Sequence, residues 1–111
     1  MSFYSRGDIV LIPFPFTDLK SSKLRPAIVV SSANVNKTED LILAQITSDI
    51  KNDNFSFEIK DADVTRPLNG YSEIRCHKIF TGSKSIITKK ISSLKPHKQI
   101  DLFSQIVTLL D

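Results

Sequence analysis

Arg25 and Thr47 are the residues of this sequence whose types and positions best suit chemistry on a phosphate. Arg25 stands directly before Pro26 and an apolar run. Pro26 fixes its own φ and disfavours helical geometry in the residue before it, so we expect Arg25 at the start of a rigid strand. A guanidinium held there can donate two parallel hydrogen bonds to a phosphate. Taken alone, however, an arginine beside a strand is more often an exposed side chain without function.

Thr47 and Ser48 end another apolar segment, "LILAQIT". Hydroxyl groups at the end of a buried strand can point toward the loops rather than the core. Their more common role is a hydrogen bond to nearby backbone. If Thr47 lies beside Arg25, the hydroxyl and the cation together could hold a phosphodiester.

The segment 74–100 contains no Asp or Glu, although the net charge of the chain is only +3. Its basic residues and histidines are Arg75, His77, Lys78, Lys84, Lys89, Lys90, Lys95, His97 and Lys98. A stretch of one sign creates a positive potential that favours polyanions or acidic proteins as partners. A solvated basic surface without a partner fits the same pattern.

Length and composition restrict the class of protein. The 111 residues suffice for one domain, 1–111, and a content of 41% apolar and 24% charged residues is typical of soluble globular proteins. A single cysteine, Cys76, excludes an intramolecular disulfide and fits a reducing compartment. The early run "DIVLIPFPF" is too short and too interrupted by proline to span a membrane. We therefore expect a cytoplasmic protein.

Hydrophobic patterning predicts five or six short strands followed by one helix. The strand candidates are residues 7–14, 25–32, 40–47, 55–60, 72–80 and 89–94. In the 55–60 segment, Phe55, Phe57 and Ile59 alternate with polar residues, as in a half-buried strand. The connection over residues 13–24 is long and without periodicity, which is often a sign of a functional loop.

The C-terminal tail changes to a helical period. Apolar residues recur there at steps of three and four, namely Ile100, Phe103, Ile106, Val107 and Leu110. Pro96 suits the first turn of such a helix because its missing N–H would have no partner there. Together these elements predict a mainly β fold, a small and strongly bent antiparallel sheet or barrel with a C-terminal helix.

Three segments, "RGDIVLIPFPF", "LRPAIVVSS" and "LILAQITSDI", resemble the PemK/MazF family of toxins from bacterial toxin–antitoxin pairs. The resemblance covers nearly the whole chain. It implies a CcdB/PemK-type fold, an SH3-like bent barrel with an added helix, assembled as a homodimer. It also implies a sequence-specific, metal-independent endoribonuclease without cofactors that cuts single-stranded RNA, such as mRNA, and leaves a 2′,3′-cyclic phosphate and a 5′-hydroxyl. The protein partner that it implies is a cognate acidic antitoxin.

The same resemblance matches Arg25 to the family's catalytic arginine and Thr47 to its catalytic threonine. Two such donors would stabilise the negative charge that grows on the phosphoryl oxygens when the ribose 2′-hydroxyl attacks. Many family members carry a glutamate in the loop before the Arg-Pro pair, whereas this chain has Lys20 near that place and only Asp18 as an acidic residue. The base is therefore open between Asp18, if the loop folds over the site, and His77, since imidazole groups exchange protons near neutral pH.

The basic segment supplies further candidates for contacts with RNA. With the loop and strand-end residues, the predicted RNA-binding set is Lys20, Lys23, Ser48, Arg75, His77, Lys78 and Lys84. We expect no metal site. Cys76 and His77 do not suggest a nucleophile pair because neighbours on a strand point to opposite faces, and we expect Cys76 to be buried and inert.

A second class of function remains open from the sequence. The missing loop glutamate is compatible with a non-catalytic module of the same fold. Such a module would hold nucleic acid or inhibit a partner protein, as gyrase poisons of the same broad fold do.

Overall fold

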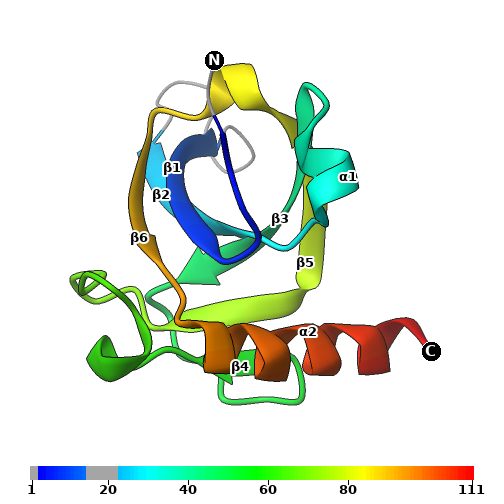
Figure 1. The fold of residues 1–111 in the computed structure, drawn as a ribbon. Coiled ribbons are helices and arrows are strands. Elements are labelled where there is room, and N and C mark those ends of the chain that lie inside the picture. The colour runs from blue at the N-terminus through cyan, green and yellow to red at the C-terminus, as the bar shows by residue number, and fades with distance from the viewer. Residues whose placement is uncertain (1–2, 15–22) are drawn as a thin grey trace.

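A computed structural model describes residues 3–14 and 23–111 of the chain. Within these residues, six strands form one antiparallel sheet in the order β4-β5-β3-β2-β1-β6 (Figure 1). The strands are β1 (Asp8–Phe14), β2 (Lys23–Val29), β3 (Asp40–Thr47), β4 (Ser56–Glu58), β5 (Glu73–Ser83) and β6 (Lys89–Ser93). The helices are α1 (Ala33–Asn36), the single 3-10 turns η1 (Asp61–Asp63) and η2 (Lys84–Ile86), and α2 (Pro96–Leu110). The predicted mainly β fold with a C-terminal helix is confirmed.

The sheet is apolar on both of its faces. The face toward α2 carries the larger cluster, in which Ile28 and Ile46 of the sheet join Leu102 and Ile106 of the helix. The sheet curls around its opposite, concave face (Figure 1). The concave cluster consists of Val10, Ile12, Ala27, Val29, Leu41 and Leu43. Because both faces of the central strands are covered, their sequences read as continuous apolar runs rather than as alternating ones.

A bulge in β5 carries the sheet around a bend. On β3, Ala44 pairs with Ile79, but the next residue, Gln45, pairs with Arg75. Residues 76–78 are therefore extra on β5, with no residue opposite on β3. Such insertions bend a strand. The first part of β5 accordingly runs with β4 close to α2, and the second part turns away along β3 (Figure 1).

The strand predicted over residues 55–60 is shorter in the structure, where β4 covers Ser56–Glu58. Phe57 is buried as expected, but Phe55 is exposed. The Phe55 ring stacks on the ring of His77, with their centroids 4.2 Å apart. His77 belongs to the β5 bulge, so the sequence pattern of one strand could not reveal this contact.

The connection predicted over residues 13–24 is also shorter. Phe14 of β1 pairs with Lys23 of β2, so the two strands extend into it from both sides. Its remaining residues, 15–22, lie outside the described part of the chain.

Helix α2 begins at Pro96, as predicted. Leu102 and Ile106 are its buried residues. The other apolar residues predicted for the tail helix have exposed fractions between 39% and 76%, namely Val107, Phe103, Ile100 and Leu110. The helix therefore has one apolar face on the sheet and a second one that stays largely exposed within the described chain. Across the described ranges, no helix combines the length and apolarity needed to cross a membrane.

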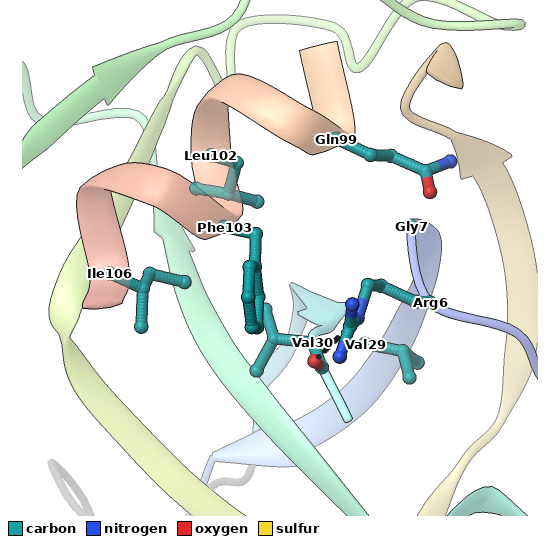
Figure 2. Close-up of a pocket in the computed structure, with 8 residues that line it drawn as sticks. All are labelled: Arg6, Gly7, Val29, Val30, Gln99, Leu102, Phe103 and Ile106. Carbon is teal, nitrogen blue, oxygen red and sulfur yellow. Dashed lines mark hydrogen bonds between the residues drawn. The ribbon is translucent and has the colours of Figure 1, made fainter. Parts of the chain in front are cut away.

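Arg6 joins the segment before β1 to α2. Its guanidinium carbon lies 4.3 Å from the centre of the Phe103 ring, and its Nε donates a hydrogen bond of 3.0 Å to the Val30 carbonyl. Figure 2 shows the end of the Arg6 side chain beside Phe103 and the Val30 carbonyl. A cation over an aromatic face is attracted by the ring's quadrupole, so this contact helps to fix the helix on the sheet.

Candidate active site

Arg25 lies in β2, between β1 and β3, in the middle of the sheet. It pairs with Ile12 of β1 and is half-buried, while Pro26 behind it is fully buried. The Arg-Pro pair is extended, as predicted. The cation is thus attached to a central strand rather than to a loop.

Pro26 sets the point at which the β2–β3 ladder ends. The Val30 N–H donates to the Ile42 carbonyl of β3 at 2.9 Å. Because backbone groups along a strand face alternate sides, every second residue before Val30 also faces β3, and Pro26 is one of these. Proline has no N–H to donate. The last ladder pair of these strands is Ala27 with Gln45.

Thr47, the last residue of β3, lies opposite Arg25 when this register is continued. The pair Ala27–Gln45 fixes the alignment, and two residues further along it Arg25 meets Thr47. Residues directly opposite in an antiparallel pair point to the same face, with Cβ atoms about 4.5–5.5 Å apart. The guanidinium and the hydroxyl therefore come from one end of the concave face.

The Thr47 hydroxyl is oriented by the loop that follows it. Its Oγ1 accepts a hydrogen bond of 3.0 Å from the Asp49 N–H. A hydroxyl that accepts in this way still has its own proton to donate. Within the described residues, no acceptor binds this hydroxyl or the Arg25 guanidinium. Two donors of this kind are suited to an anion.

An ionic network that is buried at Glu73 and Arg75 lies on the other side of Thr47. Glu73 of β5 pairs with Thr47 and is only 2% exposed. Arg75 donates through Nη1 to Glu73 Oε2 at 2.6 Å, and its guanidinium holds both carboxylate oxygens of Asp53 at 3.0 Å each. Bidentate pairs of this type are among the stronger hydrogen-bonded contacts in proteins. The network fixes the loop 48–55 against β5.

The network also changes the pKa values of its members. The hydrogen bond from the Arg75 guanidinium holds the pKa of Asp53 well below its usual range. Burial opposes the ionisation of Glu73, but hydrogen bonds from the Asn52 N–H and from Arg75 outweigh it and lower the pKa of Glu73. The Asp53 carboxylate in turn raises the pKa of Arg75. All three side chains are charged at neutral pH.

The position of Arg75 differs from that of an RNA contact. It is 7% exposed, and its guanidinium is bound to Glu73, Asp53 and the Ser56 hydroxyl. The sequence suggested an accessible cation because it contains no acidic residue between positions 74 and 100, but the partners come from outside that segment. We therefore remove Arg75 from the set of RNA contacts and regard it as structural.

The other predicted contacts are distributed over several places. Lys23 and Ser48 are exposed and adjoin the Arg25–Thr47 pair along the chain. His77 and Lys78 are exposed on the β5 bulge. Asp18 and Lys20 lie outside the described residues.

The structure does not bring Lys84 to this site. Lys84 follows Ser83, which pairs with Asp40 at the far end of β3 from Thr47. At the rise of a strand, the two ends of β3 are about 23 Å apart. The Lys84 Nζ donates to the Asn36 carbonyl at 2.6 Å, which ties η2 to α1.

Cys76 is buried, as predicted. Burial raises the pKa of its thiol to about 11, so the reactive thiolate is scarce at neutral pH. No three His, Cys, Asp or Glu side chains of the described ranges are grouped in a way that could hold a metal ion.

Sequence reasoning missed Glu73 and Asp53. Glu73 and Arg75 are two residues apart on a strand and so share a face, which is a pattern that the sequence contains. Asp53 could not be found in this way because its contact depends on the path of the loop after β3.

The network predicts a loss of stability in acid. Asp53 and Glu73 have lower pKa values in the folded chain than in the unfolded chain. Their ionised forms therefore stabilise the fold fully at a pH above their pKa values in the unfolded chain. This stabilisation is lost as the pH falls toward their pKa values in the folded chain. We expect the free energy of unfolding of the wild type to fall more steeply than that of Asp53→Asn between about pH 5 and pH 2. Urea denaturation at several pH values measures this.

Asp101→Asn, which changes an exposed carboxylate on α2, is the matched control and should behave like the wild type. Identical pH profiles for the wild type and Asp53→Asn would contradict the role given to the network.

Comparisons with known proteins agree with the overall fold of the chain. Residues 5–110 match the family described as the PemK-like, MazF-like toxin of type II toxin–antitoxin systems. A mycobacterial endoribonuclease solved in complex with its cognate antitoxin is 17% identical, with a TM-score of 0.80 over 96% of this chain and 94% of that one. MazF from the MazE–MazF complex of Deinococcus radiodurans is 18% identical, with a TM-score of 0.79 over 98% and 97% of the two chains.

The Mycobacterium tuberculosis toxin MazF-mt6 is 19% identical, with a TM-score of 0.75 over 94% of this chain and 96% of that one. A search of curated protein sequences found no significant match. The family match covers nearly the whole chain, and the solved structures share its fold. The chain belongs to the PemK-like, MazF-like toxins of type II toxin–antitoxin systems.

Proposed function

We propose that this toxin is a sequence-specific, metal-independent endoribonuclease that cleaves single-stranded RNA, with mRNA as its cellular substrate. The observation that carries the proposal is the register of β2 and β3, which aligns Arg25 with Thr47 at one end of the concave face. Both side chains have hydrogen-bond donors that no described residue accepts. The reaction takes place in the cytoplasm, where mRNA is found.

The proposed reaction is an attack of the ribose 2′-oxygen on the adjacent phosphorus. The new P–O2′ bond forms while the P–O5′ bond breaks, which leaves a 2′,3′-cyclic phosphate and a 5′-hydroxyl. Negative charge grows on the phosphoryl oxygens, and the Arg25 guanidinium and the Thr47 O–H donate to them. The attack is internal to the RNA, so these two donors can assist it without a metal ion.

Two protons have to move in this reaction. The 2′-hydroxyl loses one to a base, and the leaving 5′-oxygen gains one. We propose Asp18 as this base. Asp18 belongs to the segment that joins Phe14 to Lys23, and Lys23 is two residues before Arg25 in the sequence. His77, exposed on the β5 bulge, is the alternative.

The RNA backbone would follow exposed cations near the pair. Lys23 is two residues before Arg25, and Ser48 directly follows Thr47. Lys78 and His77 are exposed on the β5 bulge, where His77 also lines the groove between the sheet and α2. A cognate antitoxin with an acidic segment would neutralise the same cations and thereby block the RNA.

The proposed reaction leads to a prediction about the two donors. Arg25→Ala and Thr47→Ala should each lower the cleavage rate on the order of 100- to 1000-fold, because each removes a donor to the developing charge. The assay uses a long mixed-sequence RNA in the presence of EDTA, with the cut ends mapped. Arg66→Ala and Thr81→Ala are matched controls, since both residues are exposed and lie outside the site.

Discrete cuts with 2′,3′-cyclic phosphate ends, lost only in the two site variants, are the expected result. Intact RNA with folded wild-type protein at high concentration would contradict the enzyme. RNA binding without cleavage would instead indicate the non-catalytic module.

We also propose that the exposed apolar face of α2 contacts the same face of a second copy. Ile100, Val107 and Leu110 are exposed on it. The face continues into a groove of about 420 Å³ that is lined by sheet and helix residues, namely Val30, Ile42, Cys76, His77, Ile79, Phe103, Ile106, Leu109 and Leu110. A protruding apolar helix end beside an apolar groove is self-complementary under two-fold symmetry. This agrees with the homodimer that is usual in the family.

A double variant tests this contact. Ile100→Lys with Leu110→Lys should convert a dimer into a folded monomer, because it places charges in the proposed interface. Light scattering coupled to size-exclusion chromatography measures the mass. Ile86→Lys, at an exposed apolar residue on η2, should leave the dimer intact. A wild-type monomer, or a double variant that remains dimeric, would contradict the interface.

A further inference from the structure

We infer that Glu73 is a positioning residue for Thr47, acting through the loop 48–55 to orient the Thr47 hydroxyl toward the phosphate. This inference rests on the proposed function. It adds to that function a residue that does not touch RNA but on which the geometry of a catalytic donor depends.

A buried carboxylate beside a site for an anion requires an explanation. Glu73 pairs with Thr47 across the β3–β5 ladder and is almost completely buried. An uncompensated negative charge at this place would be costly to bury and would repel a phosphate. Arg75 at 2.6 Å compensates the charge on Oε2. The second carboxylate oxygen, Oε1, binds the backbone of the loop 48–55 instead.

Glu73 Oε1 holds the backbone of the loop from inside. It accepts hydrogen bonds from the N–H groups of Lys51 and Asn52, at 3.2 and 3.1 Å. Asn52 has a φ of 50°, a left-handed conformation that non-glycine residues adopt only when their surroundings support it. The carboxylate therefore fixes the turn of the loop. Asp53, held by Arg75, fixes the next residue.

The start of the same loop orients Thr47. The Asp49 N–H donates to Thr47 Oγ1, and Asp49 is further joined to Lys51 by an ion pair of 2.7 Å. A threonine hydroxyl that loses such a partner can turn among staggered rotamers. With the partner in place, its acceptor side is occupied and its proton is directed elsewhere. A donor that is already oriented in this way requires no free energy of reorganisation during the reaction.

The arrangement forms one continuous path from Glu73 to Thr47. The carboxylate holds the N–H of Lys51, Lys51 pairs with Asp49, and the N–H of Asp49 orients the Thr47 hydroxyl. The exposed ion pair contributes little by itself, so the hydrogen bonds of the buried carboxylate are the part of the path that matters. Glutamine at position 73 would keep the shape but replace one acceptor oxygen with a donor group and remove the charge that Arg75 requires.

The test is a double-mutant cycle between positions 73 and 47. In steady-state cleavage of one mapped RNA site, Glu73→Gln should lower kcat about 10- to 100-fold, with little change in KM, because the Thr47 hydroxyl is misplaced. In the Thr47→Ala background the same change should cost nothing further. Glu58→Gln, at the exposed residue that pairs with Glu73 from β4, should leave kcat unchanged.

Amide hydrogen exchange provides a second readout that does not depend on activity. The Asp49 N–H should exchange faster in Glu73→Gln than in the wild type, since the loop that carries it is no longer held by the Glu73 carboxylate. If Glu73→Gln does not fold, Asp53→Asn loosens the same loop from a more exposed position and should show the same pattern with a smaller loss of kcat.

The outcomes separate this inference from the proposed function. A wild type that cleaves no RNA overturns both. A wild type that cleaves, with equal losses from Glu73→Gln in the presence and absence of the Thr47 hydroxyl, overturns only the positioning role. Unchanged exchange at Asp49 in the loosened variants also overturns it.

Discussion

The antiparallel register between β2 and β3 is the constraint on which the candidate site depends. It aligns Arg25 with Thr47 and places both on the concave face. A slip of one residue would turn one of the two side chains toward the α2 face, and it would also take Ile28 or Ala44 out of the core. The packing of the core therefore enforces the alignment of the two donors. Pro26 ends the ladder just before this pair, so the donors lie at the border of the regular sheet.

Most of the sheet could be predicted from local patterns. The strands containing Ile9, Ile28 and Leu43 are short runs of branched and aliphatic residues, and the tail has the period of a helix. The Arg25–Pro26 pair could be placed at a strand because the effect of proline on its neighbour is local. Thr47 could be placed at a strand end because it follows the mostly apolar run of residues 41–46. The family resemblance then suggested the catalytic roles that we propose for both residues.

The remaining features depend on contacts between distant segments. The bulge at residues 76–78 places His77 against Phe55, and only the shift of register between β3 and β5 reveals it. The accessible cation expected at Arg75 is buried because Asp53 comes to it from the loop after β3. For α2, the helical period identified apolar residues but could not separate Ile106, which packs on the sheet, from the uncovered residues beside it. Local sequence thus predicts elements better than it predicts the partners of charged side chains.

The most direct measurement of the central claim is a crystal structure with an RNA oligonucleotide whose ribose at the cleavage site carries a 2′-O-methyl group, which prevents attack. We predict that the Arg25 guanidinium and the Thr47 hydroxyl both lie within about 3.2 Å of oxygens of the same phosphate. Glu73 should remain buried on Arg75 without touching the RNA. An oligonucleotide bound on another face, or a phosphate held by only one of the two residues, would contradict it.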